Sequence, residues 1–405
     1  MKAKKISDRV YALHADVRSK ELFEGIWPIP DGVTLNSYLV KGEKLALIDL
    51  VRDWGGAPAS LEAGLAEAGV KLEEVDYLVL NHLEPDHTGW LAEFRGRCPK
   101  ARILATEKGV KLVKSFYKLE AGVEAVKDGQ ELELGAGISL KFFETPNVHW
   151  PETMMSFEPS SGTLFSCDGF GGFGALGERV FDDEFSAEEH ARYEAESLRY
   201  YANIVASFGS FVIKAIQKLS GLGVKVVAPS HGIVWRKEPM KIVERYGKYA
   251  SWLEGGRDKE VCVVWGSMYG NTEKGLAAVL AGLEDEGVPY TKRRVPNEDV
   301  SYVLADAYRC EGILIAMPTY EYKMFPPMAY ALDIFARKHV NGRTALRVGS
   351  WGWVGGAEKE YAEAVAPLKW NSLPSVEWAG SPGEATIAAL REAGRELARV
   401  VKAAK

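Results

Sequence analysis

One short stretch of the sequence, residues 81–89, holds four possible metal ligands within six positions. Their order is His82-x-Glu84-x-Asp86-His87. His82 and Glu84 alternate onto one side of an extended segment, and the other two follow the bend imposed by the intervening proline. Such a loop can serve two adjacent metal ions with different ligands. The alternative is a charged surface loop that caps a helix, which needs no such particular spacing.

Three further possible ligands, His149, Asp168 and His231, each follow a strand-like run. Residues 75–80 also favour a buried strand, and they lead directly into the 81–89 loop. Side chains at the ends of such strands leave the core and meet loops that can surround an ion. Four of the seven histidines stand at these strand ends; those with bland surroundings, to which we assign no role, are His14, His190 and His339.

The elements that position these residues follow from the hydrophobic pattern of the first half of the chain. Helices are expected over 59–68, 89–94 and 106–117, the last with Thr106 as its cap. The strands expected there cover 10–13, 35–40, 45–50, 75–80, 102–105, 131–134 and 138–143. Strands and helices that alternate, with several hairpins among them, predict a layered α/β sandwich.

Residues 180–253 are mostly helical in pattern. Ser186 and Glu189 form a capping box. The aromatic run that includes Tyr201 is read most simply as core. A short flexible linker at 254–259 divides the chain, and we expect one domain over 1–254 and another over 259–405.

The second domain alternates strand and helix throughout. Strands are expected at 260–265, 289–295, 311–317, 343–349 and 374–379. Helices are expected at 271–286, 326–338, 357–367 and 383–404. This order predicts a doubly wound parallel sheet, whose ligands bind beyond the carboxyl ends of the strands.

Three loops lie at those carboxyl ends. The first runs from a strand into a helix N-terminus and offers backbone N–H groups and hydroxyls to a phosphate. The sequence has neither the ATP-type Gly-x-x-x-x-Gly-Lys pattern nor the dinucleotide Gly-x-Gly-x-x-Gly pattern. The other two loops carry aromatic residues that suit a flat ring, although Trp351 and Trp353 could instead be ordinary core. The candidate ligand-binding residues are Ser267, Met268, Tyr269, Gly270, Asn271, Thr272, Pro318, Thr319, Tyr320, Tyr322, Ser350, Trp351, Gly352, Trp353, Gly355 and Gly356.

Composition limits the classes of function. The net charge of −6 argues against a protein that binds nucleic acid by electrostatics. No apolar run follows the basic start, and none approaches the ~20 residues of a membrane span, so we expect neither a signal peptide nor a membrane anchor. The cysteines are widely spaced without any Cys-x-x-Cys, which favours the reduced cytoplasm and excludes an attached rubredoxin or zinc ribbon; they are Cys98, Cys167, Cys262 and Cys310.

The ligand pattern resembles the metallo-β-lactamase fold in its flavodiiron protein version, an αββα sandwich. Ordinary zinc members of that fold carry a second histidine where this chain has Glu84. The resemblance implies two irons, one held by His82, Glu84 and His149, the other by Asp86, His87 and His231, with Asp168 as the bridge. In some relatives the residue at the His87 position turns away from the metal. A segment near the irons in that family resembles the run containing Tyr201, which makes this tyrosine a candidate neighbour of the site.

Ligand chemistry supports iron as well. Three carboxylates together with imidazoles suit Fe(II) and Fe(III) better than a thiolate-rich site would. Imidazole and carboxylate also bind zinc, so ligand type alone leaves zinc open.

The second domain resembles flavodoxin, and the ligand that this resemblance implies is FMN. The family's phosphate loop matches at Ser267, Gly270, Asn271 and Thr272. It departs at Tyr269, where free flavodoxins usually have threonine, and this removes one hydroxyl from the phosphate cradle. A diiron domain followed directly by a flavodoxin domain is specific to flavodiiron proteins, here in their simplest two-domain class.

The resemblance implies an oxidoreductase in which FMN takes electrons from a donor and passes them to the irons, which reduce O2 to water or NO to N2O. Rubredoxin and a reduced deazaflavin cofactor serve relatives as donors, and the sequence decides neither the donor nor the gas. The family also implies a head-to-tail homodimer, or a dimer of dimers, in which one FMN lies beside the irons of the other chain.

Two other hypotheses remain. The first is a zinc hydrolase of the lactamase type, with an accessory flavodoxin domain. The second is an electron carrier in which only the flavodoxin part works. Glu84 and the flavin loops count against the hydrolase, and the complete ligand set counts against the carrier.

Overall fold

The computed structural model describes residues 3–404. The chain divides into two compact units, Met1–Ala250 and Ser251–Lys405, called unit 1 and unit 2 below. The helix α7 (Pro239–Ser251) ends at this boundary, and the first strand of unit 2 begins at Asp258, inside the expected linker.

Unit 1 contains two sheets packed face to face. Strands of the first sheet pair antiparallel up to the fourth strand and parallel after it. Its order is β1 (Lys4–Lys5), β2 (Val10–Val17), β3 (Val33–Lys41), β4 (Leu45–Ile48), β5 (Tyr77–Val79), β6 (Arg102–Thr106) and β7 (Val123–Val126). The order of the second sheet is β12 (Val226–Pro229), β11 (Thr163–Cys167), β10 (Met154–Glu158), β9 (Ile138–Glu144) and β8 (Glu131–Gly135).

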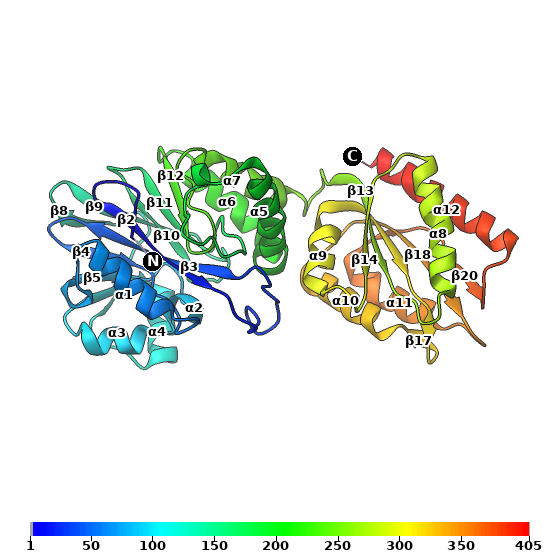
Figure 1. The fold of residues 1–405 in the computed structure, drawn as a ribbon, viewed down its shortest axis with the longest axis horizontal. Coiled ribbons are helices and arrows are strands. Elements are labelled where there is room, and N and C mark those ends of the chain that lie inside the picture. Colours follow the sequence, from blue (N-terminus) through cyan, green and yellow to red (C-terminus); the bar gives the residue numbers. More distant parts are fainter. Residues whose placement is uncertain (1–2, 405) are drawn as a thin grey trace. The chain divides into compact units, whose positions relative to one another are not determined.

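The core of unit 1 lies between the sheets, where apolar side chains from both, such as Val40 and Ile48 of the first and Phe142 and Phe165 of the second, form one buried cluster. Helices cover the outer faces, with α1 to α4 in one group and α5 to α7 in another (Figure 1). The remaining helices of this unit are α1 (Ala57–Glu67), α2 (Pro85–Thr88), α3 (Leu91–Arg97), α4 (Glu107–Tyr117), α5 (Ala187–Tyr200) and α6 (Gly209–Leu219). This is the expected αββα sandwich.

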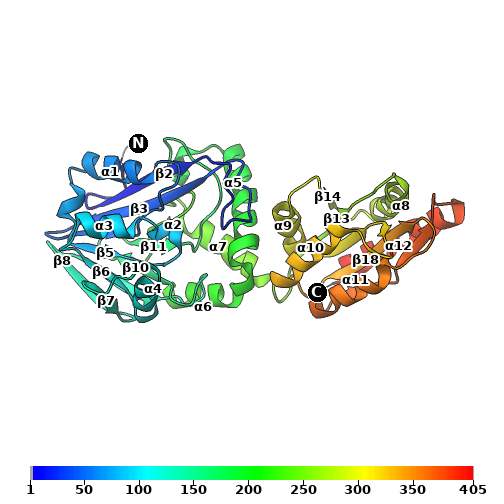
Figure 2. The ribbon, with the colours of Figure 1, turned by 90° about the horizontal axis from the view of Figure 1, so that it is seen from below.

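Unit 2 is a doubly wound parallel sheet, as expected. Its strand order is β14 (Tyr290–Arg294), β13 (Asp258–Trp265), β15 (Cys310–Ala316) and β18 (Thr344–Trp351), followed by β19 (Asn371–Ser372) and β20 (Val376–Ala379) beside β18. A small hairpin joins β16 (Thr319–Tyr320) to β17 (Lys323–Met324). Figure 2 shows helices on both faces of this sheet.

The helices of unit 2 are α8 (Asn271–Asp285), α9 (Val300–Arg309), α10 (Pro326–Arg337), α11 (Ala357–Val365) and α12 (Glu384–Ala403). Residues of α8 and α12 share one buried cluster with the sheet. The helix α9 was not predicted, although its apolar residues recur with the helical period from Val300 to Tyr308 and eight of its ten residues are buried. Within residues 3–404 no helix has both the length and the apolar character needed to cross a bilayer.

Candidate metal centre

The loop after β5 places its four candidate ligands on two sides of one turn. His82 is fully buried just beyond the strand. Glu84 has the extended backbone that a residue before proline prefers, and Pro85 opens the short helix α2, which carries Asp86 and His87. The hydroxyl of Thr88 donates to the carbonyl of Glu84 at 2.9 Å and fixes this turn.

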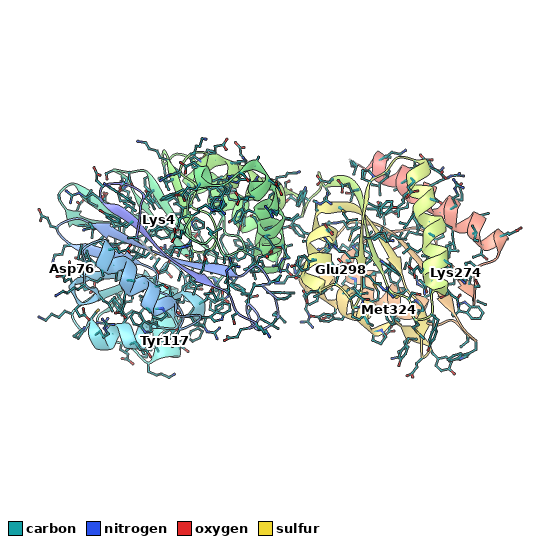
Figure 3. All side chains as sticks on the ribbon, in the orientation of Figure 1. Lys4, Asp76, Tyr117, Lys274, Glu298 and Met324 are labelled. Carbon is teal, nitrogen blue, oxygen red and sulfur yellow. The ribbon has the colours of Figure 1, made fainter. Side chains whose placement is uncertain are left out.

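The same hydroxyl of Thr88 lies 2.7 Å from that of Tyr117, labelled at the end of α4 in Figure 3. The turn that carries the ligands is thus tied to the helical layer outside the first sheet.

The other candidate ligands come from the second sheet. His149 lies in the loop after β9, Asp168 directly follows β11, and His231 follows β12. All three side chains are buried. The two sheets therefore bring residues that are far apart in the sequence to one edge of the sandwich.

Two groups of possible metal ligands meet at this edge. One contains His82, Glu84, His149 and Asp168, and the ligand atoms of each group lie within 4.8 Å of one another. The second contains Asp86, His87 and His231. Asp168 links them, because one of its oxygens lies 3.1 Å from Nε2 of His149 and the other lies 3.2 Å from Nε2 of His231.

The distances within these groups suit metal ions. Nε2 of His149 lies 3.0 Å from the Glu84 carboxylate, and Nε2 of His231 lies 3.1 Å from that of Asp86. Within the described residues 3–404 both nitrogens and both Asp86 oxygens have no partner of hydrogen-bond geometry. Two atoms that each bind one metal at about 2.1 Å are separated by about 3.0 to 3.4 Å. These buried atoms therefore fit ligands that converge on a metal.

His87 also reaches the cluster. Its Nε2 lies 2.9 Å from Asp168, and its ring centre lies 5.0 Å from that of His231. In this structure the side chain of His87 thus points toward the other candidate ligands.

Electrostatics hold the cluster together in the metal-free protein. Burial lowers the pKa values of His149 and His231, but the facing carboxylates outweigh burial and raise them to about 9 and about 10. Burial raises the pKa of Glu84, but the imidazoles of His149 and His82 outweigh it and lower this pKa to about 2. The carboxylates and imidazoles are therefore charged pairs, and a metal ion that binds must displace the imidazole protons.

A second layer of contacts fixes the ring orientation of two candidate ligands. Nδ1 of His82 lies 2.7 Å from the buried carboxylate of Glu152. Nδ1 of His231 lies 2.7 Å from the backbone carbonyl of Thr34. Sequence reasoning did not identify Glu152, and the only available signal was a glutamate three residues after His149 within a run of apolar residues.

Tyr201, the tyrosine named as a candidate neighbour of the site, packs among other aromatic rings. The ring contacts of this residue include Tyr246 and Tyr249. Its neighbour Tyr200 lies instead beside His231, with ring centres 5.7 Å apart. Consecutive helical residues point about 100° apart, and α5 continues here into a π-helical turn, Tyr201–Val205, so the two tyrosines face different neighbours.

A cavity of about 230 Å³ opens beside the cluster. Its walls include the candidate ligands Glu84 and Asp86 together with the aromatic rings of Phe23 and Trp54. Arg52 also lines it, with its guanidinium 5.3 Å from the ring centre of Trp54. A space of this size admits a diatomic molecule to the carboxylate side of the cluster.

In unit 2 the three candidate loops lie at the carboxyl ends of β13, β15 and β18, as expected for this fold. The hydroxyl of Ser267 accepts a hydrogen bond from the N–H of Gly270 at 3.0 Å. Gly270 has φ of 87°, and the first turn of α8 follows it. The hydroxyls of Thr272 and Ser350 lie 2.8 Å apart and join the first loop to the third.

The aromatic loops are exposed. Tyr269 is 88% exposed, Trp353 75% and Tyr322 63%. The rings of Tyr322 and Trp353 meet edge to face with centres 6.3 Å apart. Trp353 is therefore not a core residue, whereas Trp351 is partly buried. Figure 3 labels Lys274, in the helix α8 that follows the first loop, and Met324, in the strand β17 that follows the second loop.

Comparison with known proteins agrees with both units. The family model described as "ODP family beta lactamase" matches residues 33–232. The chain is 34% identical to a coenzyme F420H2 oxidase of Methanothermobacter marburgensis, over 99% of each chain. It is 30% identical to a nitric oxide reductase of Moorella thermoacetica, over 97% of each.

Solved structures give the same result. Rubredoxin oxygen:oxidoreductase from Desulfovibrio gigas matches with a TM-score of 0.92 and 28% identity, over 99% of each chain. The flavodiiron protein from Giardia intestinalis matches with a TM-score of 0.92 and 26% identity, over 99% of this chain and 97% of that one. The chain therefore belongs to the flavodiiron protein family, oxidoreductases that reduce O2 or NO with FMN and a non-haem diiron centre.

Proposed function

We propose that unit 1 holds the diiron centre at which this chain reduces O2 to water, NO to N2O, or both, and that unit 2 holds FMN. The observation that carries the proposal is the pair of ligand groups that the two oxygens of Asp168 link. Two such groups can hold two metals about 4 Å apart, close enough to grip both atoms of one diatomic molecule or one atom from each of two.

In the proposed assignment each iron has its own ligands. His82, Glu84 and His149 would hold one iron, Asp86, His87 and His231 would hold the other, and Asp168 would serve both. The supporting geometry is the convergence of these buried atoms at 2.9 to 3.5 Å from their carboxylate neighbours. The irons supply the redox chemistry; the chain positions them, limits water and admits the gas beside Phe23 and Trp54.

For FMN we propose that the first loop, Ser267 to Thr272, binds the phosphate through backbone N–H groups and hydroxyls. The loops 318–322 and 350–356 then hold the ring. The exposed rings of Tyr322 and Trp353 support this, because exposed groups of large apolar side chains usually mark a surface that binds a ligand or another protein.

The electron donor belongs to this proposal as well. The relatives named above include a coenzyme F420H2 oxidase and a rubredoxin oxygen:oxidoreductase. We therefore propose either a reduced deazaflavin cofactor or rubredoxin as the donor for this chain, and the cytoplasm as the place where it works.

We further propose a head-to-tail homodimer, or a dimer of dimers, in which the FMN of one chain serves the irons of the other. The exposed aromatic loops of unit 2 support an assembly that covers them. Dilution tests this directly: specific activity should fall as the dimer dissociates, whereas an active monomer would contradict the proposal.

Metal and flavin analysis of the protein, purified without oxygen, tests the assignment as a whole. We expect two irons and one FMN per chain, and consumption of added O2 or added NO in otherwise anaerobic assays with a chemically reduced donor. Zinc with little flavin would instead support the hydrolase hypothesis, and an ester or thioester screen would then follow.

A further inference from the structure

Glu152 is a charged residue next to the candidate metal centre that sequence reasoning did not identify. Its carboxylate is fully buried. One oxygen, Oε1, accepts from Nδ1 of His82 at 2.7 Å and from the backbone N–H of Leu83 at 3.1 Å. The hydroxyl of Thr106 donates to the backbone carbonyl of Glu152 at 2.8 Å and holds this segment in place.

These contacts decide which nitrogen of His82 is free. A carboxylate oxygen that already accepts a backbone N–H can only accept from the imidazole, so Nδ1 carries the proton. Nε2 then faces the cluster, where Asp168 lies 3.3 Å away and Glu84 3.4 Å away, and its lone pair becomes available when a metal ion displaces the proton there. Glu152 thus sets both the tautomer and the ring orientation of His82.

The second ligand group has a weaker equivalent. His231 donates from Nδ1 to the carbonyl of Thr34, which is a neutral acceptor. A carboxylate attracts the imidazole proton more strongly than a carbonyl does and makes the opposite nitrogen a better metal ligand. The two metal positions are therefore chemically unequal even though each has imidazole and carboxylate ligands.

We propose that Glu152 is a positioning residue that makes the metal position of His82, Glu84 and His149 the tighter of the two. This inference rests on the proposed diiron function. It concerns the order and strength of metal binding, and it predicts that a chain given one equivalent of Fe(II) fills this position first.

The test is anaerobic Fe(II) binding to metal-free protein in competition with a chelator, for the unaltered protein and for Glu152→Gln. Glutamine keeps the shape and the acceptor oxygen but removes the charge. We expect two binding steps in the unaltered protein. In the variant only the tighter step should weaken, by about 10- to 100-fold, because groups that orient metal ligands typically contribute this much to metal affinity.

Two further variants identify the step and control for burial. His231→Ala should remove the weaker step, so that adding Glu152→Gln to it weakens the one step that remains. Glu158→Gln is the matched control, because Glu158 is also fully buried in β10 but bonds to the N–H groups of Ser160 and Ser161. It should leave both steps unchanged.

The outcomes separate the two proposals. No binding of Fe(II) by the unaltered protein contradicts the diiron function. Two normal steps in the unaltered protein, with equal weakening of both steps or no weakening in Glu152→Gln, overturn the role of Glu152. The melting temperatures of the metal-free variants complete the test. If Glu152→Gln and Glu158→Gln have the same melting temperature and only Glu152→Gln weakens the tighter step, the weakening is due to the missing charge behind His82.

Discussion

The metal edge of unit 1 and the loop edge of unit 2 present two opposite ways to prepare a binding site. The candidate ligands of unit 1 are nearly all buried and held by partners behind them, as His82 is by Glu152. The aromatic loops of unit 2 are largely exposed, with Trp353 at 75%. The first site is assembled by the fold itself, whereas the second offers surfaces that become covered only on binding. Substitutions should therefore act differently at the two edges.

The largest effect is expected from Asp168→Ala or Glu84→Ala. Asp168 serves both ligand groups, so its loss should leave gas consumption below about 1% of normal, while FMN stays bound. Gas-electrode assays together with iron and flavin content measure this. Surface variant Asp183→Ala is the control. Loss of flavin along with the iron would break the comparison, because it would show that the two edges depend on each other.

Gly356→Ala should give the largest effect at the loop edge. Gly356 has φ of 150°, and a Cβ there would lie 2.2 Å from the carbonyl oxygen of Tyr322. Forcing this contact costs roughly 1–3 kcal/mol, which weakens FMN binding about 5- to 150-fold.

Fluorescence titration with FMN checks the prediction for Gly356→Ala, and iron content should be normal. Gly352→Ala is the matched control in the same loop, since nothing lies within 4 Å of its added Cβ. Equal weakening in both variants would mean that the loop tolerates no side chain at all, rather than one specific collision.

The stability of the metal-free protein should depend on pH through the charged pairs of unit 1. The pKa values of His149 (about 9) and His231 (about 10) lie above the ordinary value of 6.5. The stabilisation that the protonated His149 and His231 give the folded protein is fully present below pH 6.5 and is lost as the pH rises through 9 and 10. The melting temperature of metal-free protein should fall by several degrees over that range.

The iron-loaded protein provides the contrast, because bound metal replaces the imidazole protons and removes this dependence. Melting curves from pH 6 to pH 10, recorded with and without iron, measure the difference. Identical curves would contradict the inference that His149 and His231 are protonated in the metal-free protein and lose these protons when iron binds.

The smallest effect is expected from Trp353→Ala. Because the side chain is mostly exposed, the free energy of unfolding should change by less than about 0.5 kcal/mol. FMN binding should weaken roughly fivefold through the lost ring contact. Trp378→Ala, at a buried position of the same unit, should instead cost about 3–5 kcal/mol. Denaturant unfolding and FMN titration distinguish the two.

Sequence reasoning reached the family, the fold class and the residues that meet at the metal edge because His82, His149 and Asp168 stand where strands end. Strand ends are visible in a sequence, and scarce residue types there are conspicuous. Partners behind the ligands are not visible in this way. Glu152 looks like an ordinary glutamate until the fold buries it, and its partner His82 is 70 positions away.

One other feature needed the backbone itself. Tyr200 and Tyr201 are adjacent, and only the helical geometry shows that the first faces His231. The helix α9, in contrast, was overlooked although Val300, Val303 and Leu304 follow the helical period, so the sequence did carry the signal for it.

The position of His231 has a consequence for how the protein is made. Four candidate ligands, His82, Glu84, His149 and Asp168, have all been synthesised once the ribosome passes β11, whereas His231 follows only after α5 and α6. The strand β12, which precedes it, joins the edge of an already paired sheet. Since chains emerge and begin to fold from the N-terminus, a nascent chain possesses one complete ligand group before it possesses the other.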